Sequence, residues 1–227
     1  LDPNSPAASE EWLGGPLVTL RNMRLLVQGL HDIHTRGKPS LPPGAIRTGW
    51  DGRTEVMVAP GDAFDKALLT GFSCTVRMEK GMSERDVHER QASYYSKKDN
   101  AAGVSLILGA GNVASIPPTD AFHKLFTEGK VCIVKLNPVN EYLGPFYEQA
   151  LKPLVDRGLL RFCYGGADVG SYLSYNDHVS DIHITGSDRT HDLIVWGPPG
   201  PERERRKAAN DPLLKKNMTS ELGCVTP

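Results

Sequence analysis

The sequence has few cysteines and almost no net charge. Its 227 residues include 4 cysteines, 26 basic and 27 acidic side chains, for a formal net charge of −1. The cysteines show no CxxC or zinc-ligand spacing, so they predict free thiols in a reducing compartment rather than a disulfide framework. Cys132 and Cys163 lie in apolar runs, which is typical of a cysteine used as a small hydrophobic residue. The balanced charge argues against a nucleic-acid partner or an anionic membrane surface.

A long apolar run and a signal-peptide pattern are also missing. A membrane-spanning helix needs about 20 consecutive apolar residues, and no stretch of this sequence approaches that length. We therefore expect no membrane partner, and we predict a cytoplasmic location. What the sequence does have is 39% hydrophobic residues. That share is enough for the core of one large domain, or of one domain with a smaller lobe.

Residues 1–100 predict mixed helices and strands. Apolar residues recur at helical spacing between residues 10 and 36, which predicts a long amphipathic helix. A stretch rich in proline and glycine at 37–52 predicts a loop. Beyond it we expect strands at 53–59 and 73–78, a helix at 62–69 and a polar helix at 83–98. We assign residues 1–100 to helical and strand material that packs on the domain following it.

A regular alternation of short apolar strands and helices begins at residue 103. Strands are expected at 104–108, 131–135, 159–164 and 181–185. Helices are expected up to 128, at 141–156, at 167–175 and after 188. This alternation is typical of βαβ units, so we predict an α/β fold for residues 101–227: a Rossmann-like parallel sheet with helices on both faces that binds a dinucleotide. The charged segment at 198–207 is expected to be a solvated loop.

One loop carries a phosphate-binding pattern. The run GAGNVA at 109–114 matches G-x-G-x-x-A between a predicted strand and a predicted helix, where glycines let the backbone approach a pyrophosphate. A glycine-rich turn that only packs tightly would show the same letters. The next strand ends in Lys135, where an ordinary NAD-binding fold has an acidic residue. A cation there tolerates a ribose phosphate or reaches the ribose from another angle.

Four blocks, in order, resemble the aldehyde dehydrogenase superfamily. They are LGAGN at 108–112, VKLNP at 134–138, GGADVG at 165–170 with ITGS at 184–187, and SELG at 220–223. The resemblance is good from about residue 103 to 227 and looser before it. It implies NAD or NADP as the cofactor, an aldehyde as the small-molecule substrate and a homo-oligomer as the assembly.

The resemblance also implies roles for individual residues. Asn112 would donate a hydrogen bond to a developing oxyanion, and Glu221 would be the general base that activates water to hydrolyse a thioester. The cofactor-binding residues that it implies are Leu108, Gly109, Ala110, Gly111, Lys135, Asn137, Gly166, Gly170, Thr185, Gly186, Ser187 and Leu222. The family's nucleophilic cysteine lies well downstream of the glutamate block, so we expect it outside this chain and do not assign that role to Cys224. No metal site is expected.

Three positions depart from the family pattern. Gly111 stands where the family has an aromatic residue, and Cys224 where a second glycine is usual. Pro138 replaces a glutamate that favours NAD, and Glu141 could substitute for it only if the loop is shaped differently. The preference between NAD and NADP therefore stays open.

Three functions stay open at this point. The first is the cofactor-binding part of an aldehyde dehydrogenase that forms an acid through a cysteine thioester and is inactive as this piece alone. The second is an acyl-CoA or acyl-phosphate reductase on the same scaffold. The third is a non-catalytic nucleotide-binding module.

Overall fold

The computed structural model describes residues 2, 4–97 and 102–223. The chain divides into two compact units. Unit 1 consists of Leu1–Arg24 and Asp99–Pro227, and unit 2 consists of Leu25–Lys98.

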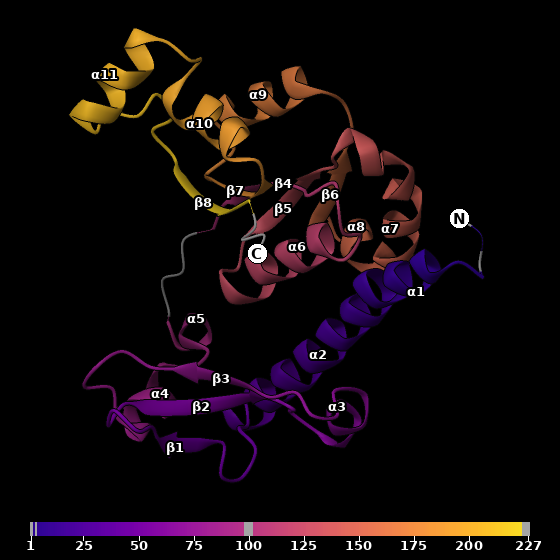
Figure 1. Ribbon diagram of the computed structural model, residues 1–227, viewed down its shortest axis with the longest axis vertical. Coiled ribbons are helices and arrows are strands. Elements are labelled where there is room, and N and C mark those ends of the chain that lie inside the picture. The colour runs from indigo at the N-terminus through magenta and orange to yellow at the C-terminus, as the bar shows by residue number, and fades with distance from the viewer. Residues whose placement is uncertain (1, 3, 98–101, 224–227) are drawn as a thin grey trace. The chain divides into compact units, whose positions relative to one another are not determined.

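Unit 1 is built on a sheet of five parallel strands in the order β6-β5-β4-β7-β8 (Figure 1). The strands are β4 (Val104–Leu108), β5 (Val131–Lys135), β6 (Leu160–Cys163), β7 (Asp181–Gly186) and β8 (Asn217–Leu222). The chain adds β5 and β6 on one side of β4 and then crosses to place β7 and β8 on the other side. This is the doubly wound order of a dinucleotide-binding fold, and it confirms the predicted α/β class with a Rossmann-like parallel sheet.

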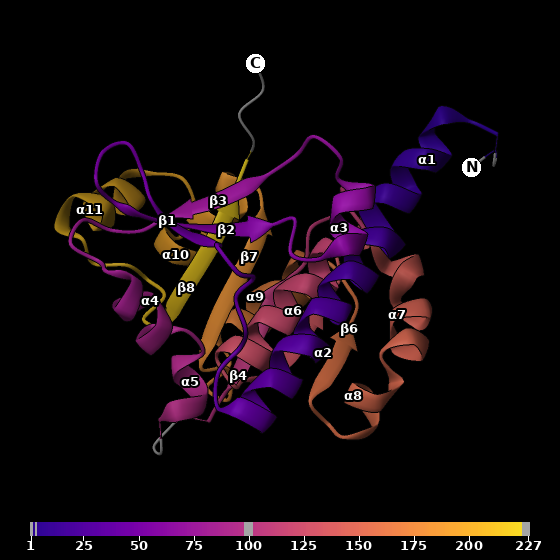
Figure 2. The ribbon, with the colours of Figure 1, turned by 90° about the horizontal axis from the view of Figure 1, so that it is seen from below.

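Helices cover both faces of this sheet (Figures 1 and 2). On one face lie α6 (Ile116–Thr127), α7 (Gly144–Ala150) and α8 (Lys152–Asp156), with the 3-10 helix η2 (Pro138–Leu143) leading into α7. On the other face lie α9 (Ala167–Tyr175) and α10 (Asp188–Trp196), followed by α11 (Pro201–Ala209). Among the described residues, no helix combines the length and apolar character needed to cross a bilayer.

The two faces of β7 differ in polarity. Ile182 and Ile184 face α9 and α10 and belong to the core cluster that includes Leu106 and Ile194. Side chains in a strand alternate between faces, so Asp181, His183 and Thr185 face α6 instead. One strand of unit 1 therefore closes an apolar core on one side and presents polar groups on the other.

Several predicted boundaries are wrong. Residues 198–207 were expected to be a solvated loop, but α11 covers most of them. Pro201 occupies the first helical turn, where its missing N–H costs nothing, and Glu202 pairs with both Arg205 and Arg206 one turn later. Such i,i+3 and i,i+4 pairs stabilise a helix that composition alone makes look disordered. The arginines also hold the pKa of Glu202 down at about 2.

The long helices are interrupted. Residues 10–36 form α1 (Pro6–Trp12), the π-helical turn η1 (Leu13–Leu17) and α2 (Val18–Arg36). The expected helix at 141–156 starts as η2 and is divided between α7 and α8, and strand β8 was not expected at all.

Unit 2 contains a three-stranded antiparallel sheet in the order β1-β2-β3. Its elements are β1 (Ile46–Thr48), β2 (Thr54–Ala59), α3 (Ala63–Leu68), β3 (Cys74–Arg77), α4 (Glu84–Arg90) and α5 (Ser93–Ser96). The buried carboxylate of Glu55 on β2 pairs with Arg47 on β1 and Arg77 on β3. Strand β1 lies inside the stretch expected to be a loop, and the expected polar helix at 83–98 is broken because Ala92 adopts a left-handed conformation (φ 51°).

Candidate functional site

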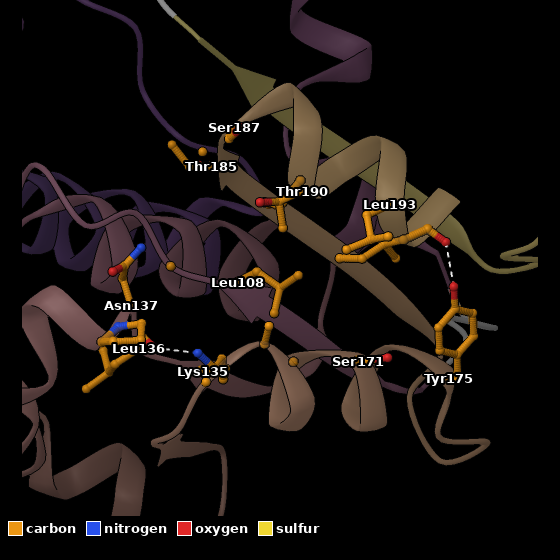
Figure 3. A pocket seen from close by; sticks show the side chains of 18 of the residues that line it. Leu108, Lys135, Leu136, Asn137, Ser171, Tyr175, Thr185, Ser187, Thr190 and Leu193 are labelled. Atoms are coloured by element: carbon orange, nitrogen blue, oxygen red, sulfur yellow. Dashed lines mark hydrogen bonds between the residues drawn. The ribbon is translucent and has the colours of Figure 1, made fainter. Parts of the chain in front are cut away.

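A pocket of about 420 Å³ opens on the α9–α10 face of unit 1, at the carboxyl ends of the strands (Figure 3). The residues Leu108 on β4, Lys135 on β5 and Ile184 on β7 line it. Strands β4 and β7 are the neighbours at which the strand order reverses, and ligands of open α/β sheets bind at this switch point. The volume falls within the range of roughly 300–1,000 Å³ that small-molecule sites occupy. We call this cavity the switch-point pocket.

Lys135 supplies the formal charge of the switch-point pocket. Its side chain is buried (7% exposed), and its ammonium donates a hydrogen bond to the carbonyl oxygen of Leu136 at 3.0 Å. None of the other described residues that line the pocket carries a formal charge. A buried ammonium in a cavity without a carboxylate favours an anionic ligand, because the anion offsets the cost of burying the charge.

Glycines form the floor of the switch-point pocket where α9 begins. Gly166 and Gly170 both line it, and a Cβ on Gly170 would lie 4.0 Å from Leu108 and from Lys135. Gly165 has a φ of +114°, which only glycine adopts readily, and its N–H donates to the carboxylate of Glu141. Glu141 therefore holds this turn in place. This contact gives Glu141 a structural role that needs no hydrogen bond to a hydroxyl group of a ligand.

Thr185, Gly186 and Ser187 form the opposite rim and lead into α10. The Ser187 hydroxyl accepts a hydrogen bond from the N–H of Arg189 at 3.1 Å and so caps the helix. The Thr185 hydroxyl donates to Asp120 Oδ2 on α6 at 2.9 Å. Thr185 thus lines the switch-point pocket while its hydroxyl reaches to the other side of the sheet.

The loop with the phosphate-binding pattern lies only partly in the pocket. Gly109 lines the pocket beside Leu108, whereas Ala110 is buried and Gly111 packs against Asn137, another residue of the lining. A Cβ on Gly111 would lie 2.7 Å from Asn137 Cγ. This close approach gives a physical reason for glycine at position 111. Asn112 follows, exposed, before α6.

Glu221 and Leu222 are exposed at the end of β8. Glu221 lies beside Thr185 in the parallel ladder and Leu222 beside Gly186. Glu221 lines a second cavity of about 380 Å³ on the α6 face of the sheet. We call this cavity the polar cleft. Cys224 lies outside the described residues.

An apolar wall of the switch-point pocket was missed in the sequence. Tyr175 on α9, Thr190 and Leu193 on α10, and Leu213 after α11 line it (Figure 3). The Tyr175 hydroxyl donates to the carbonyl oxygen of Ile194 at 2.7 Å and joins the two helices. None of these residues belongs to a motif. Only the helical spacing of Thr190, Leu193 and Ile194 could have placed them on one face.

The described cysteines of unit 1 are poor nucleophiles. Cys132 is buried, and burial raises the pKa of its thiol to about 12. Burial also raises the pKa of Cys163. Because the thiolate is the reactive form, neither thiol is suited to attack an aldehyde. Their place in the sheet agrees with the structural role expected from the apolar runs around them.

Comparisons with known proteins gave structural likenesses only. No family model matches the sequence, and no curated protein matches it. The chain is similar to a solved putative aldehyde dehydrogenase from Burkholderia cenocepacia, with 22% identity over 53% of this chain and 23% of that one and a TM-score of 0.40. It is similar to succinic semialdehyde dehydrogenase from Streptococcus pyogenes in complex with NADP+, with 21% identity over 53% and 24% of the chains and a TM-score of 0.38. A third likeness is glyceraldehyde-3-phosphate dehydrogenase from Methanocaldococcus jannaschii complexed with NADP, with 23% identity over 58% and 26% of the chains and a TM-score of 0.37. The chain spans about a quarter of the length of these structures.

Proposed function

We propose that unit 1 binds NAD or NADP as part of an aldehyde dehydrogenase that oxidises an aldehyde to an acid through a cysteine thioester. The observation that carries the proposal is the switch-point pocket. Lys135, Gly166, Gly170, Thr185 and Ser187, named from the family resemblance, all line this one cavity. These residues belong to β5, to α9, to β7 and to the turn after β7. Their spacing in the sequence does not require them to line the same cavity.

The pocket fits an anionic dinucleotide. Gly166 and Ser187 stand at the N-termini of α9 and α10, each 9 residues long. The helix dipole favours phosphate at such positions. Helix α9 begins without a side-chain cap, whereas the Arg189 N–H at the start of α10 already donates to Ser187. Lys135 adds a full positive charge, while Leu193 and Tyr175 supply apolar surface for a ring. The side-chain oxygen of Asn137 accepts a hydrogen bond from the N–H of Val139 and caps η2. Asn137 therefore contributes to the wall of the pocket, and this oxygen is already bonded.

Each residue then has a defined task in the proposed reaction. A bound nicotinamide supplies the acceptor for hydride. Asn112 donates its amide N–H to the oxygen of the tetrahedral adduct, an interaction worth about 3 kcal/mol. Glu221 takes a proton from the water that hydrolyses the thioester. The thiolate is a separate requirement, since neither Cys132 nor Cys163 has thiolate character.

A second candidate is a nucleotide-binding module without catalysis, which needs the cofactor pocket and no thiolate. Titration of the longest natural form of the protein with NAD and NADP, followed by treatment with an aldehyde, separates the two. Aldehyde-dependent reduction of NAD or NADP by the protein supports the dehydrogenase. Binding without turnover in the longest natural form of the protein supports the module.

The pocket also favours NADP over NAD. None of the described lining residues has a carboxylate that would repel a ribose phosphate. The ammonium of Lys135 attracts such a phosphate. We expect NADP to bind at least as tightly as NAD. Failure of both nucleotides to bind at millimolar concentration, with the chain folded by circular dichroism, sinks the proposal.

A further inference from the structure

The apolar end of the switch-point pocket is completed where α10 ends. Lys135 and Tyr175 lie at opposite ends of the pocket (Figure 3). The Tyr175 hydroxyl donates to the carbonyl oxygen of Ile194 in the last turn of α10. Three further residues line the pocket at this end of α10, and we call them the end wall: Gly197, Pro198 and Leu213.

The end wall stands at the two ends of the segment 197–213, which carries α11. The chain leaves α10 at Gly197, which has a φ of +93°. It returns at Leu213, whose N–H donates to the carbonyl oxygen of Val195 at 2.8 Å. The structure describes all 9 residues of α11, and none of them is buried. Since apolar burial contributes little here, polar contacts have to hold the segment in place.

Two side chains of α11 bond back to α10 and to its end. Arg203 donates from Nε and Nη2 to the carbonyl oxygen of Gly197, at 2.8 and 2.6 Å. Lys207 donates to Asp192 at 2.6 Å. Asp192 is not among the described residues that line the pocket, whereas Gly197 is. Arg203 therefore fastens α11 to the end wall itself, through hydrogen bonds that its charge makes roughly twice as strong as neutral ones.

We infer that Arg203 is a positioning residue for the cofactor: it holds the end wall in the shape that receives a ring of the nucleotide. The inference rests on the proposed function, in which the apolar surface at this end takes a ring. It goes beyond that function because Arg203 belongs to none of the sequence motifs and is not among the described residues that line the pocket. Arg203 acts through Gly197 and not through a contact with the ligand.

Removal of the guanidinium should weaken binding by a defined route. Without its two hydrogen bonds the segment 197–213 has one anchor fewer, so the end wall is in place in a smaller fraction of the folded chains. The Kd of a ligand that needs the wall rises by the inverse of that fraction. Since Lys135 attracts the ribose phosphate of NADP in the proposed function, and that phosphate belongs to the adenosine half, adenine is the ring that the end wall receives.

The test measures the Kd of NADP and of adenosine 2′,5′-bisphosphate for the full chain by isothermal titration calorimetry. Arg203→Met keeps an apolar stem and removes both donors. Loss of a hydrogen bond from a charged group, at the lower end of its usual strength, predicts that the Kd of both ligands rises about tenfold. Arg203→Lys keeps the charge and a donor, so it should restore part of the affinity.

Arg205→Met is the matched control. It removes the same charge from the same helix, and the Arg205 side chain is 59% exposed and pairs with Glu202 instead of Gly197. Its Kd values should stay within about threefold of those of the wild-type chain. Equal rises in the two methionine variants overturn the inference, because the charge of α11 would then matter rather than the contact with Gly197. Values within about threefold of wild type in a folded Arg203→Met chain overturn it as well, since a loss of stability alone leaves the Kd of the folded chain unchanged.

The wild-type chain gives an independent readout. Coupling between two sites is reciprocal, so a ligand that needs the end wall also strengthens the contact that holds it. Saturation with adenosine 2′,5′-bisphosphate should therefore slow the exchange of the Arg203 Nε–H with water, followed by ¹⁵N NMR. Unchanged exchange in the saturated chain overturns the inference while the proposed function stands. Failure of the folded wild-type chain to bind either ligand refutes the proposed function, and the inference with it.

Discussion

Replacing Lys135 with methionine should affect cofactor binding and folding stability in different ways. The Lys135 side chain is 7% exposed, and its ammonium has the carbonyl oxygen of Leu136 as a hydrogen-bond acceptor at 3.0 Å. Methionine has similar length and lacks the charge. Burying an ammonium costs free energy that a single neutral acceptor offsets only in part, so the free energy of unfolding should stay within about 1 kcal/mol of the wild-type value or rise.

Binding of NADP should weaken in the same variant. A hydrogen bond to a charged group contributes about 1.5–3 kcal/mol, which corresponds to a rise in Kd of about 10- to 150-fold. Isothermal titration calorimetry measures the Kd, and urea denaturation measures the stability. Lys152→Met is the matched control, because Lys152 lies on α8 in an exposed pair with Asp156. A Lys135→Met variant that folds and binds NADP within threefold of wild type, about 0.65 kcal/mol, would refute the role of the charge.

Three further predictions concern packing, pH and thiol reactivity. Gly111→Ala should lower the free energy of unfolding by about 1–3 kcal/mol, because the new Cβ meets Asn137 Cγ at 2.7 Å. In urea denaturation the same change should cost much less when it is made in an Asn137→Ala variant, which serves as its own reference because it lacks the cap of η2. An equal cost in both backgrounds would contradict the steric cause. Burial raises the folded-state pKa of Asp120 above its ordinary value of 3.8, so the protonated carboxyl stabilises the fold below about pH 4 and this contribution is lost as pH rises through the folded-state pKa. Asp120→Asn should therefore reduce the decrease in the free energy of unfolding over this pH range. A pH profile of stability equal to that of the wild type would contradict the raised pKa. At pH 8, iodoacetamide should label the exposed Cys74 in minutes and leave Cys132 unmodified until the chain unfolds, because burial raises the pKa of Cys132 to about 12. Peptide mass mapping measures the labelling. Equal labelling of the two cysteines would show that Cys132 is accessible.

The sheet could be predicted where its strands are buried on both faces. The apolar runs of β4 and β5 are short, bounded by glycine or charged residues, and separated by a helix, and this pattern predicts parallel strands. Strand β8 was missed because its sequence, NMTSEL, is almost wholly exposed at the edge of the sheet and carries no apolar run. Helix α11 was missed for a related reason. Its stability comes from charge pairs such as Glu202 with Arg206, which composition does not distinguish from a solvated loop.

The site was predictable only to the extent that its residues belong to motifs. Lys135, Gly170 and Thr185 could be named from their blocks, but the contact between Gly111 and Asn137 joins residues 26 positions apart and follows only from the fold. The polar cleft shows the same limit. The alternation of Asp181, His183 and Thr185 is visible in the sequence, yet the partners of His183 come from α6 and β8.

Cofactor binding in the switch-point pocket is tested by titrating the folded wild-type chain with NADP and measuring hydrogen exchange along the backbone. We predict saturable binding with a Kd of about 1 mM or tighter. We also predict slower exchange in the segments that line the switch-point pocket, from Gly166 to Tyr175 and from Thr185 to Ile194. Absence of binding to a folded chain, or protection confined to segments outside this pocket, would contradict it.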